Sequence, residues 1–222
     1  MEFFLDTANV DDIKRFARIG IVDGVTTNPA LIAKEGRNFI NVVEEICRIV
    51  DGPVSAEVIS TDVKEMIQEA RMIAKIHDNI VVNIPAIPSG FETVFAVSQE
   101  GVKTNLTIVY TANQALIGAK VGAPYVSPFV GRLDAGSTSG IDLVKEIAQI
   151  YKNYDFKTKI LAASMRNVVY VKQAALAGAH VATIPPEVLG EMMESELTEL
   201  GLRGFLKDWE KLPEEKRQYF AH

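Results

Sequence analysis

The feature that most constrains this chain is the regular alternation of short apolar runs with longer amphipathic stretches along its 222 residues. Such alternation is typical of strands separated by helices. The candidate strands are Phe3–Asp6, Gly24–Thr27, Val54–Val58, Ile80–Ile84, Lys103–Thr107, Tyr125–Ser127, Lys159–Ala163 and His180–Ile184. Strands joined through helices pair in parallel, and eight such units predict an α/β fold, an eight-stranded parallel β/α (TIM) barrel.

An open, doubly wound sheet is the alternative architecture. It is less favoured because no strand is followed by the dinucleotide fingerprint Gly-x-Gly-x-x-Gly. Gly101, Gly122 and Gly178 each stand where a helix should end, as glycine does at left-handed helix caps. We expect one domain over residues 1–222, with a C-terminal helix at about 197–212 beyond the barrel.

The charge balance argues against nucleic acid or an anionic membrane as a partner. The chain has 23 Lys and Arg against 29 Asp and Glu, a net charge of -6, and no basic run. The N-terminus lacks the pattern of a secretory signal, and no apolar stretch is long enough to span a membrane. We therefore expect a cytoplasmic protein. Its one cysteine, Cys47, lies on the apolar side of a predicted helix, so we expect it to be buried in the core with a packing role only.

Polar side chains recur at the carboxyl ends of the predicted strands, which is the end where β/α barrels carry their active sites. They are Asp6, Thr26, Thr27, Asn28, Glu57, Asn83, Asn105, Thr107, Ser127 and Ser164. Taken singly, each has a structural alternative. Asp6 could cap the next helix. Thr26 and Thr27 could be present because threonine favours β-strands, and Glu57 could simply be exposed to solvent at the end of the barrel.

Glu57 and Asn83 interrupt apolar runs, where an unpartnered amide costs about 1–3 kcal/mol and an isolated carboxylate costs more. The alternation of a strand puts Val81, Asn83 and Pro85 on one face. If the other face meets the helices, Asn83 points into the barrel.

Arg132 and Arg166 lie just beyond strand ends, with Ser164 close to the second. Guanidinium groups offer forked donors to phosphate oxygens, so this set predicts a phosphorylated small molecule as ligand. A surface salt bridge is the alternative for either arginine alone. His77 and His180 precede strands and His222 is terminal, which argues against Ser/His/Asp chemistry and against a zinc site.

The sequence resembles the small transaldolase family, which includes fructose-6-phosphate aldolases. The matching segments are Phe4-Leu5-Asp6-Thr7-Ala8-Asn9, Gly24-Val25-Thr26-Thr27-Asn28-Pro29, Ser55-Ala56-Glu57-Val58, Thr104-Asn105-Leu106-Thr107, Tyr125-Val126-Ser127-Pro128-Phe129-Val130-Gly131-Arg132 and Ala162-Ala163-Ser164-Met165-Arg166. They run in order from the first strand to the last helix.

The resemblance implies a β/α barrel that transfers a dihydroxyacetone unit between phosphorylated sugars through a lysine Schiff base, without metal or organic cofactor. Asp6 would move protons, while Glu57 and Thr107 would hold the water of imine chemistry. Substrate would be bound by Thr27, Asn28, Asn105 and Ser127, and its phosphate by Arg132, Ser164 and Arg166. Glu57 and Phe129 resemble the transferase branch. Relatives form rings or pairs of rings, so the resemblance also implies a homo-oligomer.

One position departs from the family. Its Schiff-base lysine stands just before Ile-Pro on the fourth strand, where this chain has Asn83. A carboxamide nitrogen is delocalised into its carbonyl and cannot condense with a ketone as an amine does. Lys75, Lys103, Lys120 and Lys159 are all expected away from the active rim. The asparagine is either introduced or natural.

Three hypotheses remain open: a transaldolase, or a fructose-6-phosphate aldolase, impaired at Asn83; a non-catalytic protein that binds a sugar phosphate; or an isomerase that uses Asp6 and Glu57 as an acid–base pair.

Overall fold

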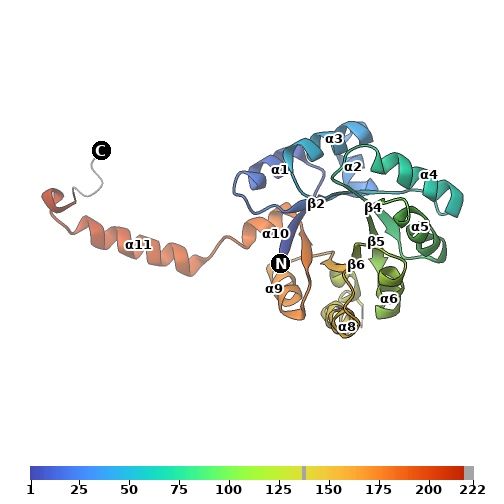
Figure 1. Ribbon diagram of the computed structural model, residues 1–222. Helices are drawn as coiled ribbons and strands as arrows, with labels where there is room; N and C mark the ends of the chain where they lie inside the picture. Colours follow the sequence, from blue (N-terminus) through green and yellow to red (C-terminus); the bar gives the residue numbers. More distant parts are fainter. Residues whose placement is uncertain (137–138, 218–222) are drawn as a thin grey trace.

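The computed structural model describes residues 1–136 and 139–217; the terminal His222 lies outside them. Eight parallel strands close into a barrel in sequence order, so the predicted fold is confirmed (Figure 1). The strands are β1 Glu2–Asp6, β2 Gly24–Thr26, β3 Val54–Glu57, β4 Ile80–Pro85, β5 Thr104–Val109, β6 Tyr125–Pro128, β7 Lys159–Ala162 and β8 Val181–Ile184.

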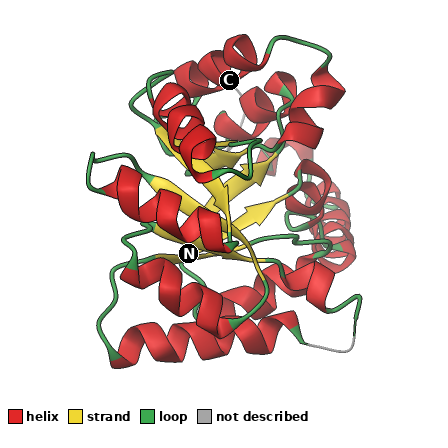
Figure 2. Cartoon of the chain, turned by 90° about the vertical axis from the view of Figure 1, so that its right-hand side faces the viewer, coloured by secondary structure: helices red, strands yellow, loops and turns green. Residues whose placement is uncertain are grey.

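Helices surround the barrel, and all α-helices except α11 (Glu196–Glu210) bury apolar side chains against it (Figure 2). They are α1 Val10–Ala17, α2 Pro29–Glu35, α3 Phe39–Ile49, α4 Val63–Ala74, α5 Pro88–Ser98, α6 Ala112–Lys120, α7 Val130–Leu133, α8 Gly140–Asn153, α9 Val168–Ala177, α10 Pro186–Glu191 and α11 Glu196–Glu210, followed by a short 3-10 helix, Glu214–Lys216. Asn9, not Asp6, accepts the hydrogen bonds that cap α1, so capping does not explain Asp6.

The glycines predicted to end helices adopt left-handed backbone conformations. Gly101, Gly122 and Gly178 have φ of 81°, 94° and 93°. Residues with a Cβ adopt this region at a cost, so glycine there permits a short turn from helix to strand. Cys47 is buried on α3 among core side chains, as expected.

The inside of the barrel divides into an apolar half and a polar half. One small apolar cluster fills the interior: Phe4, Val81, Tyr125, Leu161, Ala163 and Val181, with Phe129 packed on it. Leu161, Ala163 and Phe129 reach up from it to line the pocket at the carboxyl ends of the strands. Val81 and Asn83 share the inward face of β4, and Asn83 is the next inward residue toward the carboxyl end. The cluster therefore forms a floor beneath the polar residues of the rim.

Strand register places the central polar residues side by side. Glu57 of β3 pairs with Asn83 of β4, and Asn83 pairs with Asn105 of β5. Neighbouring strands are about 5 Å apart, so paired side chains on the same face lie within hydrogen-bonding reach. Outside this layer, the hydroxyl of Thr104 is the single buried side-chain polar atom without a hydrogen-bond partner in the described part of the chain.

Helix α11 differs from the other long helices because none of its residues is buried. It projects away from the barrel beyond α10, on the side opposite α4 (Figure 1). The helix was expected over about 197–212 and is found at Glu196–Glu210. No helix among the described residues is long and apolar enough to cross a membrane.

Candidate active site

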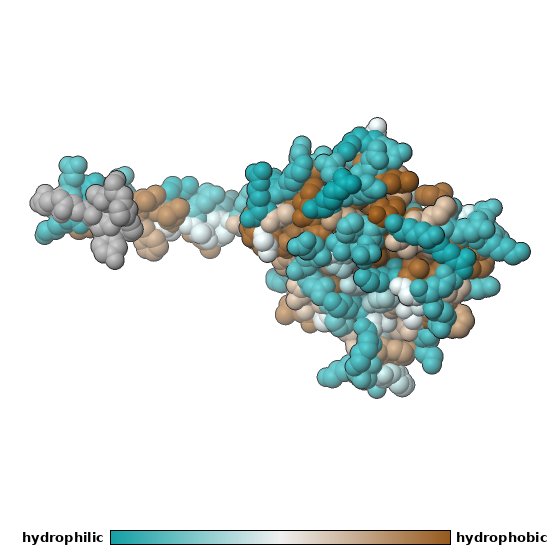
Figure 3. All heavy atoms as spheres, turned by 45° about the horizontal axis from the view of Figure 1, so that its top comes forward, coloured by the Kyte–Doolittle hydropathy of each residue, from teal (hydrophilic) through white to brown (hydrophobic). Residues whose placement is uncertain are grey.

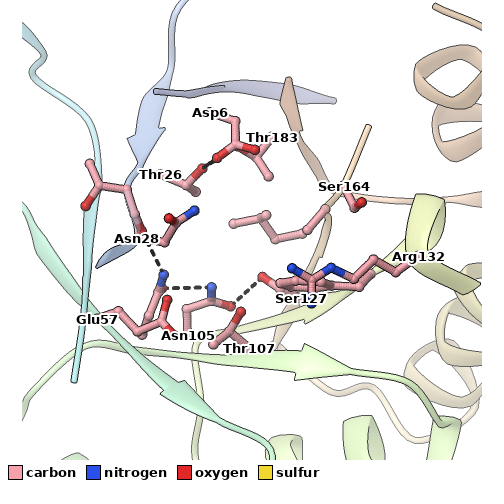
Figure 4. A pocket seen from close by; sticks show the side chains of 15 residues that line it. Asp6, Thr26, Asn28, Glu57, Asn105, Thr107, Ser127, Arg132, Ser164 and Thr183 are labelled. Carbon is pink, nitrogen blue, oxygen red and sulfur yellow. Dashed lines mark hydrogen bonds between the residues drawn. The ribbon is translucent and has the colours of Figure 1, made fainter. Parts of the chain in front are cut away.

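A pocket of about 150 Å³ opens at the carboxyl ends of the strands (Figure 4). The predicted site residues that line it are Asp6, Thr27, Asn28, Glu57, Asn83, Asn105, Thr107, Ser127, Phe129, Arg132 and Ser164. Residues far apart in the sequence converge here because each stands at the corresponding end of a successive strand or in the loop after it.

Arg166 is the one predicted site residue that does not line this pocket. Its side chain is exposed. Its stem passes so close to Gly131 that a Cβ there would come within 3.1 Å of Arg166 Cγ. The side chain thus lies beside the residue that precedes Arg132, outside the pocket wall.

Asn83 lies buried at the centre of a lateral chain of hydrogen bonds. Its Nδ2 donates to Ser55 Oγ at 3.2 Å and to the carbonyl oxygen of Thr27 at 3.4 Å. Its Oδ1 accepts a hydrogen bond of 3.0 Å from Asn105 Nδ2, and Ser127 Oγ donates to Asn105 Oδ1 at 2.9 Å. The chain spans β3 to β6 and satisfies both ends of the Asn83 amide, so the burial of this polar group is compensated.

Asp6 receives a hydrogen bond from Thr26, whose Oγ1 donates to Asp6 Oδ1 at 3.1 Å. The Thr26 hydroxyl is in turn hydrogen-bonded to Thr183 of β8. Burial disfavours the charged carboxylate and raises the pKa of Asp6 from 3.8 to about 6, although the Thr26 hydrogen bond opposes this shift. An acid with a pKa near 6 can both accept and release a proton at neutral pH.

Glu57 is half-buried on the far side of the pocket from Asp6 (Figure 4). Burial raises its pKa, and a hydrogen bond with Asn83 works in the opposite direction. Two carboxyl groups with raised pKa values in one cavity are typical of functional sites.

A cation and an aromatic ring form the third wall. The guanidinium carbon of Arg132 lies 5.2 Å from the centre of the Phe129 ring, within the range of a cation–π contact. Phe129 also meets Tyr110 edge to face. Ser164 has a left-handed backbone with φ of 62°, which is uncommon for a residue with a side chain. The strained backbone of Ser164 therefore lies at the pocket itself, where such strain is frequent.

Asn28 uses its side chain in two directions. Its Oδ1 accepts a hydrogen bond of 2.9 Å from Leu31 N and caps α2. The amide nitrogen is then the group that Asn28 offers to the pocket.

Four lining residues were not among the predicted site residues: Thr26, Leu161, Ala163 and Thr183. In the sequence Thr26 stands at a strand end, where β propensity alone can explain a threonine, but in the structure its hydroxyl contacts Asp6. Leu161 and Ala163 are apolar and carry no chemical signal. Thr183 is one polar residue inside the apolar run Val-Ala-Thr-Ile, the same signal that singled out Asn83.

Neither described histidine lines the pocket. His180 Nδ1 accepts a hydrogen bond from Ile160 N, and His77 Nδ1 accepts one from Asn79 N, both at the amino ends of strands. Within residues 1–136 and 139–217, no three His, Cys, Asp or Glu side chains gather as metal ligands would.

The raised pKa of Asp6 predicts a pH-dependent stability. Between about pH 4 and pH 6 the folded state holds a proton that the unfolded state has lost, so stability falls as the pH rises through this window. Asp6→Asn removes this effect and should raise the free energy of unfolding near pH 7.5 by about 3 kcal/mol. The gain should shrink near pH 4.5. Urea unfolding at both pH values measures it.

The control is Asp51→Asn, which alters an exposed carboxylate. It should change stability by a similar small amount at both pH values. A gain from Asp6→Asn that does not depend on pH would contradict the buried, proton-holding carboxyl described above.

Comparison with known proteins identifies a family and close relatives for this sequence. The sequence model of the family "Transaldolase/Fructose-6-phosphate aldolase" matches residues 3–216. A "Probable transaldolase" of Thermoanaerobacter sp. (strain X514) is 56% identical over 211 residues, which are 95% of this chain and 98% of that relative. One from Caldicellulosiruptor saccharolyticus is also 56% identical, over 214 residues that cover 96% of this chain and 99% of the relative.

Among solved structures, a mandelate oxidase mutant with an FMN adduct superposes with a TM-score of 0.59 at 15% identity, covering 83% of this chain and 63% of that one. A likeness at this identity concerns the barrel fold alone. The relatives of higher identity and the family match decide the assignment: this chain belongs to the transaldolase/fructose-6-phosphate aldolase family.

Proposed function

We propose that the pocket serves a transaldolase-type reaction. In it, a dihydroxyacetone unit passes from a ketose phosphate, such as fructose 6-phosphate or sedoheptulose 7-phosphate, to an aldose phosphate acceptor. The observation that carries this proposal is the position of Asn83, buried at the pocket on β4, next to Glu57 of β3 and in the same pocket as Asp6 of β1. An amine at that position would reach a ketone held by the surrounding donors. The names of the relatives support transaldolase over aldolase.

The proposed chemistry runs through an imine. A lysine amine adds to the ketone carbon of the donor, and loss of water leaves an iminium ion. The iminium withdraws the electrons of the adjacent carbon–carbon bond, which breaks as a base removes the proton of the neighbouring hydroxyl. With Asn83 in this place, the amide can hold a substrate by hydrogen bonds but cannot form the imine. We therefore propose that the chain as it stands binds substrate and is impaired in turnover.

Each wall of the pocket has a proposed role. Asp6, with its pKa near 6, takes and returns the hydroxyl proton. Glu57 and Thr107 hold the water that leaves and re-enters during imine chemistry. Thr27, Asn28, Asn105 and Ser127 bind hydroxyl groups, and Phe129 forms the wall beneath Arg132.

The proposed phosphate site is Arg132 together with Ser164, both at the pocket. A guanidinium group and a hydroxyl suit phosphate oxygens. Arg166 lies beside Gly131 and is proposed as a second cation that turns toward the phosphate when substrate binds. This is the one role that requires a side chain to move.

An isomerase that uses Asp6 and Glu57 is the second candidate. The observation in its favour is that burial raises the pKa of both carboxyl groups, which lie across the pocket from each other. Such a pair can move a proton between neighbouring carbons without an amine. Interconversion of sugar phosphates by the unsubstituted chain would select this candidate, and binding without any conversion would select a non-catalytic sugar-phosphate binding protein.

The pocket can accept a lysine at this position. Asn105 now donates to Asn83 Oδ1 and accepts from Ser127. If its amide turns over, Asn105 can accept from a lysine and donate to the Ser127 hydroxyl, which works in either direction. The substitution therefore leaves both Asn105 and Ser127 with hydrogen-bond partners.

Asn83→Lys should gain covalent capture of substrate. Incubation with fructose 6-phosphate and borohydride should reduce the imine to a stable amine, and the mass of the intact protein should rise by one substrate-derived unit. Transfer activity should appear in the same variant. The unsubstituted chain and Asn83→Leu, which has a side chain of similar size without an amine, should show no adduct. Absence of an adduct with folded Asn83→Lys would overturn the proposed reaction.

We also propose that the chain forms a homo-oligomer through α11. The helix has no buried residue, yet Leu200 and Phe205 expose apolar side chains along it. Exposed apolar surface of this extent is typical of interaction sites. An isolated helix of 15 residues is marginal in water, so docking would stabilise it.

A groove on the barrel offers a matching surface. It has a volume of about 490 Å³ between α2, α3 and α4, and is lined by apolar side chains such as Ile32, Phe39, Ile40 and Met72. Figure 3 shows brown side chains gathered on this face of the barrel and again along the projecting helix. The helix of the same chain leaves from the other side, so the proposed occupant is α11 of a second copy. Such a head-to-tail contact gives a ring when the rotation between neighbouring copies closes the circle.

The proposed contact can be tested by light scattering. The unsubstituted chain should give a particle several times its 24.4 kDa mass. Phe205→Glu should reduce that particle, because a buried carboxylate opposes docking. Leu176→Glu, a change at an exposed leucine of α9, is the control and should not reduce it. A particle of one chain's mass before substitution, or equal particles for both variants, would contradict the proposal.

A further inference from the structure

Thr183 contacts the acid–base side of the pocket from a strand that carries none of the predicted site residues. It is buried on β8, and its hydroxyl is hydrogen-bonded to the hydroxyl of Thr26 on β2. Thr26 in turn donates to Asp6 Oδ1. Strands β8 and β2 flank β1, so the two threonines reach across the strand that carries Asp6 and meet on the inner face of the barrel.

The number of available protons determines which group donates and which accepts in the hydrogen bonds that link Thr183, Thr26 and Asp6. Each threonine hydroxyl has one proton, and an ionised carboxylate accepts without donating. When Asp6 is charged, the Thr26 hydroxyl therefore donates a hydrogen bond to Asp6 Oδ1. The Thr26 oxygen then accepts a hydrogen bond from the Thr183 hydroxyl. When Asp6 is protonated on Oδ1, both hydroxyls can turn and the chain runs from Asp6 to Thr183. In both states the hydrogen bonds among Asp6, Thr26 and Thr183 are kept without movement of the heavier atoms.

Other charged groups near Asp6 act on it without a hydrogen bond. Glu187 on α10 disfavours the carboxylate, while Lys34 on α2 favours it. Thr26 is the side chain that hydrogen-bonds to Asp6 in the described structure. The Thr26 bond engages Oδ1 and leaves Oδ2 to face a substrate hydroxyl.

We propose that Thr183 is a positioning residue: it orients the Thr26 hydroxyl onto Oδ1 of Asp6 and so keeps Oδ2 for proton transfer with the substrate. The role given to Asp6 rests on the proposed function, but the hydroxyl chain does not. Thr183 acts through Thr26 and does not itself touch the reacting atoms.

The consequence is a shift in the proton affinity of Asp6. A hydrogen bond is strengthened when its donor oxygen itself accepts another hydrogen bond. Loss of the Thr183 hydroxyl weakens the bond from Thr26 to Asp6, and the charged form of Asp6 loses more than the neutral form because charge-assisted bonds are stronger. The apparent pKa of Asp6 should therefore rise above its value of about 6.

Carboxyl-carbon NMR of the protein labelled at aspartate measures this directly, with the Asp6 signal assigned by its loss in Asp6→Asn. Thr183→Val, which keeps the shape and removes the hydroxyl, should raise the Asp6 pKa by about half a unit. Thr26→Val should raise it by more. Thr104→Val is the matched control, because it removes a buried hydroxyl without a hydrogen-bond partner in the described part of the chain, and it should leave the pKa unchanged.

A second pair of variants separates the loss of the Thr183 hydroxyl from a change in side-chain packing. Thr183→Ser and Thr183→Ala both lose the methyl group and differ mainly by the hydroxyl, so only the alanine variant should shift the titration. Equal Asp6 pKa values in this pair, or an unchanged value in Thr183→Val beside a raised one in Thr26→Val, would overturn the role of Thr183. The titration uses no substrate, so failure of Asn83→Lys to capture a sugar would leave its outcome intact.

Discussion

The lateral register of β3 to β6 is the constraint on which the site depends. It sets Glu57, Asn83 and Asn105 side by side at one level of the barrel, directly above the apolar floor formed around Val81 and Tyr125. A slip of one residue in any of these strands would turn its polar side chain toward the helices, where it would be buried without a partner. The apolar floor and the polar rim thus come from the same alternation along each strand.

Within that register, both ends of the Asn83 amide have suitable hydrogen-bond partners. Its nitrogen faces two oxygen acceptors and its oxygen faces a donor. In the proposed reaction this is the position where an amine would act, in a pocket that also holds two carboxyl groups whose pKa values are raised by burial. The Asn83 amide can hold a ligand by hydrogen bonds, but its delocalised nitrogen cannot supply the amine that the proposed imine chemistry requires.

Much of this arrangement could be predicted from the sequence because strands leave a strong local signal. Short apolar runs, glycine at helix ends and polar residues at strand tips indicated the barrel and most of the pocket. The sequence could not indicate pairwise contacts across the barrel, such as the one between Thr26 and Thr183, because these depend on register between distant strands. Nearness to a strand end likewise did not reveal that Arg166 leaves the pocket beside Gly131, because a loop sets the direction of that side chain.

The proposed reaction requires a ketose phosphate in this pocket with its ketone carbon at Asn83. A crystal structure of the unsubstituted protein with fructose 6-phosphate would show where the sugar binds. We expect the ketone carbon in contact with the Asn83 side chain, the phosphate against Arg132 and Ser164, and a sugar hydroxyl on Asp6. A sugar phosphate bound elsewhere, or bound here with its ketone turned away from Asn83, would contradict the proposed reaction.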